Sequence, residues 1–191
     1  MAEEIRESKR QELLEAGVLE LDRYGIINFS VRRIAEACHV SPGAPYKHFH
    51  NRNEFIAEII RYNYDRWFAE LREIIAAHPR DYRAQIVELL ISYVRFLVEH
   101  PHFRSLLMVK DDRFDESYRG LRGGLTKLTE SIARKYCVQF GIEEEVYYRK
   151  VFILRSYMYG AALMFGNGEM EYDEKGIALV RRAAERELDL P

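Results

Sequence analysis

The sequence predicts an all-α fold of about nine helices, with an N-terminal three-helix unit followed by a larger helical body. Three observations support this prediction. Apolar residues recur every three or four positions over long segments, most clearly over residues 81–100. Capping residues such as Ser30, Asn51 and Gly141 bracket these segments. An apolar content of 48% in 191 residues is ample for a packed core.

The first two helices are bounded by clear start and stop signals. Residues 3–24 carry one apolar stripe, and Gly25 should end that helix in a left-handed conformation. Ser30 is expected to cap a second helix that runs to about Cys38. His39 then falls in a tight turn, because histidine tolerates the left-handed region better than most residues.

A third, short helix is expected from Pro42 to His48, with Ser41 as its N-cap and proline at its first position. Pro45 removes one hydrogen bond of the first turn and disfavours helical backbone at Ala44, so this helix should be slightly distorted. Two short helices joined by a tight turn form a helix-turn-helix, whose second helix can enter the major groove of DNA.

The helix-turn-helix segment is more basic than the rest of the chain. Residues 30–52 contain four basic residues against one acidic residue, Glu36, whereas the whole chain has a net charge of −2. Such a patch suffices for the phosphate neutralisation on which DNA affinity depends. Three histidines add further hydrogen-bond donors. The basic residues are Arg32, Arg33, Lys47 and Arg52.

This segment resembles the DNA-binding domain of the TetR family of bacterial regulators over about residues 9–60. The rest of the chain is similar to the family only in length and helical character. The resemblance implies a homodimeric repressor that binds a near-palindromic operator and usually releases it when a small molecule binds the body. The matching features are Tyr24-Gly25, Phe29-Ser30-Val31-Arg32, Ile34-Ala35, Val40-Ser41-x-Gly43 and Tyr46-x-His48-Phe49-x-Asn51-Arg52.

The resemblance also suggests how the DNA contacts divide. Matching positions in family members contact the DNA backbone, and these are Arg32, Tyr46, His48 and Arg52. The helix starts at Ser30 and Ser41 present free N–H groups to phosphate. Base reading would fall to Gly43, Ala44 and Lys47, with Arg33 as a further candidate, and lysine can donate to guanine O6 and N7. Two small residues leave the operator sequence unpredicted.

The body is expected to hold six further helices. The first of them closes the three-helix unit and then enters the body, so we expect a DNA-binding domain at 1–55 and a ligand-binding and dimerisation domain at 56–191. The last two helices have the composition of the four-helix dimer interface that the family implies, or they complete a monomer core. The helices are expected at residues 52–77, 81–100, from Pro101, 114–140, 143–165 and 173–188, with a charged turn at Asp111–Asp112.

Aromatic and methionine side chains of the body suggest a ligand pocket for an aromatic or apolar effector. The alternative is that these residues are ordinary core. The pocket candidates are Tyr93, Phe96, Phe103, Met108, Tyr147, Phe152, Tyr157 and Met158.

Other classes of protein lack support in the sequence. The two cysteines, Cys38 and Cys137, show no metal spacing and suggest a reducing cytoplasm.

The N-terminus carries no apolar signal segment, and no apolar run approaches the roughly 20 residues of a membrane span. No phosphate loop or hydrolase motif is present, so we expect neither enzyme activity nor a cofactor. For Cys38, a buried structural thiol is favoured over a redox sensor.

The sequence therefore favours a ligand-responsive, DNA-binding repressor located in the cytoplasm. Two alternatives stay open. One is an architectural DNA-binding protein or activator without an effector, which a body without a cavity would favour. The other is a helical small-molecule-binding or enzymatic protein with a vestigial helix-turn-helix, which a failure to bind duplex DNA would favour.

Overall fold

The computed structural model describes residues 2–108 and 115–190, and within these ranges all regular secondary structure is helical. Eight α-helices and one 3₁₀ turn are present there, which confirms the predicted all-α fold. The predicted turn at Asp111–Asp112 lies outside the described residues. The helices are α1 (Ala2–Tyr24), α2 (Val31–Ala37), α3 (Arg52–Ala77), α4 (Tyr82–Glu99), α5 (Pro101–Met108), α6 (Asp115–Phe140), α7 (Glu144–Gly166) and α8 (Glu174–Asp189).

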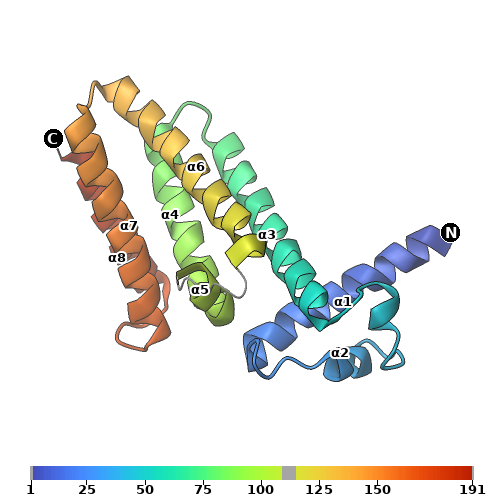
Figure 1. Cartoon of the computed structure of the whole chain (residues 1–191). Helices are drawn as coiled ribbons and strands as arrows, with labels where there is room; N and C mark the ends of the chain where they lie inside the picture. Colours follow the sequence, from blue (N-terminus) through green and yellow to red (C-terminus); the bar gives the residue numbers. More distant parts are fainter. Residues whose placement is uncertain (1, 109–114, 191) are drawn as a thin grey trace.

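The helices form a small N-terminal unit and an elongated body that share α3 (Figure 1). α1 packs against α2 and against α3, which continues into the body. Within the body α4 is central, because it packs against α3, α5, α6, α7 and α8. α7 and α8 lie side by side at the edge of the body farthest from the N-terminal unit. In the described part of the chain, no helix combines the length and apolar character needed to cross a membrane.

Capping side chains set the helix boundaries that the sequence predicted. The Ser30 hydroxyl accepts a hydrogen bond from the Arg33 backbone N–H at 3.3 Å, and the Asn51 side chain accepts one at 2.9 Å. Gly25 has a φ of 69° and Gly141 one of 63°, so both end their helices in the left-handed region. His39 takes a φ of 54° in the tight turn after α2, as expected.

The third helix was predicted wrongly. Instead of a helix from Pro42 to His48, the chain forms a single 3₁₀ turn at Pro45–Lys47. Pro45 has no N–H to donate to the Ser41 carbonyl, which accepts a turn hydrogen bond from Ala44 at 2.9 Å. Ser41 therefore caps no helix starting at Pro42. Ala44 nevertheless has helical backbone angles, with φ −62° and ψ −39°, despite the proline that follows it.

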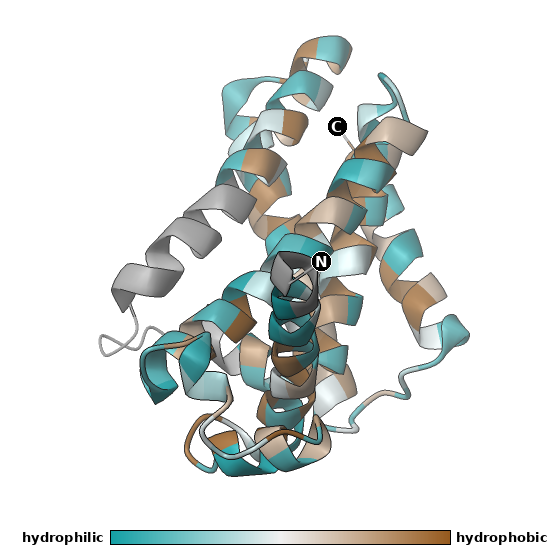
Figure 2. Ribbon diagram, turned by 90° about the vertical axis from the view of Figure 1, so that its right-hand side faces the viewer, coloured by the Kyte–Doolittle hydropathy of each residue, from teal (hydrophilic) through white to brown (hydrophobic). Residues whose placement is uncertain are grey.

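Two apolar clusters fill the interior. The first cluster runs without interruption from the N-terminal unit along α3 into the body, and includes Leu13, Phe49, Phe55, Trp67 and Phe96. The second joins α4, α6, α7 and α8. Hydrophilic and hydrophobic segments alternate along the body helices, as expected where one face packs and the other is exposed (Figure 2). The N-terminal unit and the body are therefore joined by packed side chains as well as by backbone.

Polar residues of α4 find partners on neighbouring helices. Ser92 is buried, accepts a hydrogen bond from the Trp67 indole N–H at 2.9 Å and donates to Glu70 at 2.8 Å. Glu88 is held by the Arg181 guanidinium of α8, which lowers the pKa of that carboxyl. These contacts fix the register of α4 against α3 and α8.

We predict that Leu97→Ala lowers the free energy of unfolding by about 2–5 kcal/mol, because Leu97 is fully buried and its loss leaves a cavity. Leu19→Ala, on the exposed side of α1, should change it by less than about 0.5 kcal/mol. Urea unfolding at one fixed protein concentration checks both variants. An equal loss of unfolding free energy in the two variants would contradict the burial of Leu97 on α4.

Candidate nucleic-acid interface

Exposed side chains gather on the segment formed by α2 and the turns that follow it. The Arg32 side chain is 79% exposed on α2, and Tyr46 is 51% exposed on the 3₁₀ turn beside the exposed Lys47. Gly43 has open space where a side chain would begin. These residues present two cations and a phenol to the outside of the N-terminal unit.

The opposite side of this segment is anchored by aromatic rings. Phe49 is almost fully buried and stacks on Phe55 of α3, with ring centroids 4.1 Å apart and planes 11° apart. Phe29 meets Phe55 edge to face at 5.8 Å. Pro45, within the 3₁₀ turn, is buried as well. The exposed turn therefore sits on a packed base, although it makes few backbone hydrogen bonds of its own.

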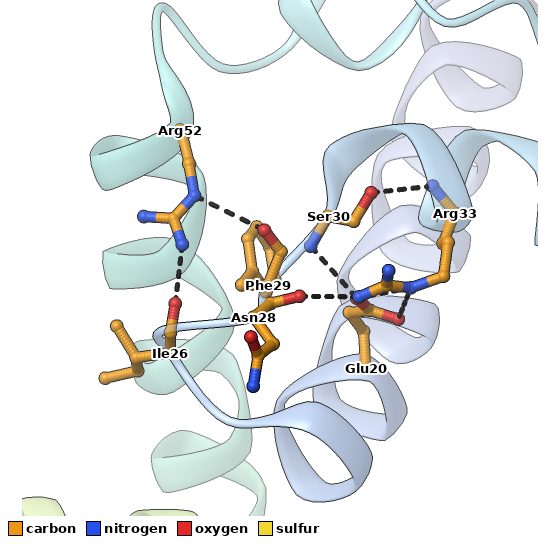
Figure 3. A network of polar contacts seen from close by, with 7 residues as sticks. All are labelled: Glu20, Ile26, Asn28, Phe29, Ser30, Arg33 and Arg52. Atoms are coloured by element: carbon orange, nitrogen blue, oxygen red, sulfur yellow. Dashed lines mark hydrogen bonds and ion pairs between the residues drawn. The ribbon is translucent and has the colours of Figure 1, made fainter.

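A buried carboxylate organises the start of α2 (Figure 3). Glu20 of α1 is only 7% exposed, and its Oε1 accepts the Ser30 backbone N–H at 2.9 Å. The Arg33 guanidinium forms an ion pair with the same carboxylate, with Nε 3.0 Å from Oε1. Arg33 also donates to the Asn28 carbonyl at 2.5 Å. Glu20 thus fixes α2 and the preceding loop against α1.

These contacts tie the Arg33 side chain to α1, although it stays 43% exposed at the surface. Its guanidinium lies over the Tyr24 ring at 4.3 Å, and its hydrogen bond to Glu20 raises the pKa of the guanidinium. Its Nε and Nη2 donate to Glu20 and Asn28, so a base contact could use these donors only by breaking those hydrogen bonds. The structure therefore places Arg33 as a support for α2.

Arg52 has a similar supporting position at the start of α3. Its guanidinium donates to the Ile26 carbonyl at 2.5 Å and to the Phe29 carbonyl at 3.4 Å, as Figure 3 shows. His48 is half-buried beside Phe49. Burial, followed by the nearby Arg6 and Arg10 cations, lowers the pKa of His48, so its imidazole is mainly neutral at pH 7.

The ten residues predicted to contact DNA thus separate into three groups. Arg32, Ser41, Gly43, Tyr46 and Lys47 are exposed, Ala44 and His48 are half-buried, and Ser30, Arg33 and Arg52 are committed to internal hydrogen bonds. Sequence reasoning missed Glu20, because nothing in the pattern of α1 distinguishes this carboxylate from the other acids of that helix.

A second candidate site is a cavity of about 300 Å³ in the body, between α3, α4, α6 and α7. This volume is at the lower end of ligand pockets in proteins. Of the predicted pocket residues, Tyr93 and Met158 line it. The other lining residues are Tyr64, Leu71, Ile86, Leu89, Leu90, Thr129, Glu130, Ile132, Ala133, Val151, Leu154, Arg155 and Tyr159.

The remaining pocket candidates lie elsewhere. Phe96 stacks on Trp67 at 4.4 Å, and Phe103 is buried in the same cluster. Tyr147 packs into the second apolar cluster. Phe152 and Tyr157 point away from the cavity and are exposed on α7, and the side chain of Met108 lies outside the described residues.

Cys38 has the environment of a structural thiol. It is buried, its Sγ lies 3.7 Å from the Glu12 carbonyl oxygen, and burial raises the pKa of the thiol. A protonated, covered thiol is a poor redox sensor. In the part of the chain that the structure describes, no three His, Cys, Asp or Glu side chains gather as a metal site would require.

Comparison with known proteins assigns the N-terminal unit to a sequence family. Residues 13–59 match the family of bacterial regulatory proteins described as the tetR family. The chain is also 29% identical over 107 residues to the "Probable acrEF/envCD operon repressor" of Escherichia coli (strain K12). That match covers 52% of this chain and 46% of the relative, so the chain spans about half the length of the relative it matches.

Solved structures of regulators share the complete fold. The transcriptional regulator FadR from Bacillus subtilis, in complex with stearoyl-CoA, has a TM-score of 0.75 at 13% identity, over 94% of this chain and 97% of that one. A TetR transcription regulator from Haloarcula marismortui has a TM-score of 0.70 at 16% identity, over 96% and 97%. At such low identity these likenesses establish the fold alone.

Two neighbouring arginines of α2 give a test of the Glu20 network. Arg33→Ala should lower the urea midpoint clearly, because it leaves the buried Glu20 carboxylate without its cation. Arg32→Ala should stay close to wild type, because Arg32 is exposed and pairs only with Glu36 one turn away. Equal midpoints for the two variants would show that the network does not hold α2.

Proposed function

The chain belongs to the TetR family of bacterial transcriptional regulators, and from this premise we propose that it is a homodimeric repressor whose operator is released by a small molecule. The observation that carries the proposal is the exposed Tyr46–Lys47 pair on a turn whose other side is packed on Phe55. Such a base holds the contacting side chains in register with a DNA groove. No part of the mechanism calls for catalysis or a cofactor.

The DNA contacts follow from chemistry and exposure. Lys47 is the exposed residue of the 3₁₀ turn that can donate to guanine O6 and N7. Tyr46, next to Lys47 on the turn, and Arg32 on α2 are also exposed, and both side chains can donate hydrogen bonds to phosphate oxygens. Contacts with phosphate carry no sequence information. Because the recognition element is one short turn, few side chains reach base edges. We therefore expect a modest number of specified base pairs in each half-site.

Exposed apolar side chains on α7 and α8 support the proposed dimer. Phe152 is 71% exposed in the single chain and Leu179 is 50% exposed. Large apolar side chains exposed on two neighbouring helices are typical of an interaction site in a soluble protein. Two copies of α7 and α8 would form a four-helix interface that covers it. The exposed apolar residues of these helices are Tyr148, Phe152, Tyr157, Leu163, Met164 and Leu179.

The body cavity supports the proposed effector response. Tyr64 and Leu71 of α3 line the cavity, while Phe55 and Ile59 of the same helix pack against the N-terminal unit. A ligand that fits only one tilt of α3 would therefore bias the spacing of the two recognition turns. It can do so only by its difference in affinity for the two arrangements. The likeness to a regulator crystallised with stearoyl-CoA agrees with a small-molecule ligand.

This proposal assigns residues 1–55 to DNA binding and residues 56–191 to ligand binding and dimerisation, with α3 shared between them. The cavity disfavours an effector-independent architectural protein. Selection of binding sites from random duplex DNA tests the proposal as a whole. A selected palindrome with steep salt dependence supports it, and unselective binding would contradict it.

Lys47→Ala and Tyr46→Ala should have different effects on DNA recognition. Lys47→Ala should relax the preference at one or two base pairs of each half-site, at a cost of about 1–3 kcal/mol per half-site. Tyr46→Ala should weaken binding to all duplexes alike. Site selection and fluorescence anisotropy with both variants check this. If Lys47→Ala selects the same site as wild type at every position, Lys47 does not contact the bases.

The dimer face is tested by introducing a buried charge. Phe152→Glu should shift the chain from dimer to monomer at micromolar concentration, because an unpaired carboxylate would be enclosed at the interface. Val138→Glu is the matched control, since Val138 is 84% exposed on α6, which is not part of the proposed α7–α8 interface. Sedimentation velocity separates the outcomes. A Phe152→Glu dimer as stable as wild type would place the interface elsewhere.

A further inference from the structure

The walls of the body cavity are mostly hydrocarbon, with a small set of polar groups. Aliphatic side chains from α4, α6 and α7 supply most of the lining, among them Leu89, Ile132 and Leu154. Of the lining residues, Arg155 is the one cation and Glu130 the one carboxylate. A ligand for this cavity must therefore bury a substantial apolar body and meet few polar groups.

Arg155 is exposed on α7 and lacks the carboxylate partner that several arginines at helix interfaces of this chain have. Arg33, Arg83 and Arg181 each pair with a carboxylate on another helix. Among the described residues no carboxylate lies within ion-pair distance of Arg155. Glu130, which lines the same cavity, does not pair with it either. A guanidinium beside an apolar cavity, without an internal anion, has its donors available to a ligand.

The position of Arg155 suits a group at the mouth of the cavity. Arg155 and Tyr159 lie four residues apart on one face of α7, and both also line a shallow outer groove together with Phe152. Tyr159 contacts Tyr93 inside the cavity, with ring centroids 6.1 Å apart. Arg155 thus stands where the outer groove meets the inner cavity, next to two phenol groups, and in the proposed dimer the partner subunit would cover that groove and close the cavity on this side.

We propose that the cavity binds an amphipathic monoanion, a molecule with a hydrocarbon or aromatic body and one carboxylate, and that Arg155 pairs with the carboxylate. The proposal rests on the proposed function only in taking this cavity as the effector site. One cation at the mouth matches one negative charge. A cationic amphiphile that placed its charge at the mouth would be repelled by Arg155.

Binding of three probes that share one chain length tests the charge of the ligand. Dodecanoate, dodecanol and dodecylamine, each below its micelle concentration, are titrated into the full-length protein by calorimetry. Wild type should bind dodecanoate about tenfold more tightly than dodecanol, as a charge-assisted hydrogen bond implies, and dodecylamine most weakly. Equal or tighter binding of dodecanol or dodecylamine, or no binding of dodecanoate, overturns the proposal.

Two charge variants and two cavity-filling variants localise the effect. Arg155→Gln should bind dodecanoate and dodecanol equally, whereas Glu130→Gln should keep the preference for the acid. Ala133→Phe should weaken all three probes, because it fills the cavity from α6. Leu89→Phe serves the same purpose if Ala133→Phe fails to fold by circular dichroism. Unchanged dodecanoate binding in the filled variant would mean that the probe binds outside the cavity, which also overturns the proposal.

Operator binding, measured separately, distinguishes this proposal from the proposed function. Dodecanoate that binds in the cavity but leaves the selected operator bound would support the ligand class and contradict the effector role. Release of the operator by dodecanol at concentrations where dodecanoate has no effect would support the regulator and contradict the ligand class. Release by dodecanoate in wild type, lost in Arg155→Gln, supports both.

Discussion

The apolar face of α3 is the constraint on which the rest of the structure depends. Its first turns carry Phe55 and Ile59, which close the N-terminal unit, and its later turns carry Trp67 and Leu71, which pack in the body. Because interiors are close-packed, a helix that fills two adjoining cores cannot tilt in one without repacking the other. The proposed response at the DNA to a ligand in the body would need a connection of this kind, which the packing of α3 can supply.

The N-terminal unit uses its charges in two different ways. The buried Glu20 carboxylate pairs with the exposed Arg33, so one of the basic residues near the proposed DNA face holds α2 on α1. Arg52 likewise fastens the loop before α2. The exposed Arg32 and Lys47 remain available for the proposed contacts with nucleic acid. A count of basic residues in the segment therefore overstates the charge that is free to meet phosphate.

Much of the fold could be predicted from the sequence, because capping residues and apolar periodicity are local signals. The bounds of α3 and the left-handed turn at His39 followed from such signals. The recognition element did not, because a single missing N–H at Pro45 was enough to replace an α-helix by a 3₁₀ turn. The cavity lining was mostly missed, since Phe96 and Leu89 show the same periodicity on α4 and only tertiary packing decides which of them faces an empty space.

The central claim is that occupancy of the cavity moves the recognition turns through α3. A spin label on Ile27→Cys, an exposed position of the N-terminal unit, would report by pulsed dipolar spectroscopy the distance between the N-terminal units of the two subunits of the proposed dimer. Both native cysteines are buried, which protects them from labelling. We expect a single distance distribution for the free protein. It should become narrower when the operator is bound, and its mean should change when dodecanoate is bound. An identical distribution with the cavity empty and occupied would contradict the account.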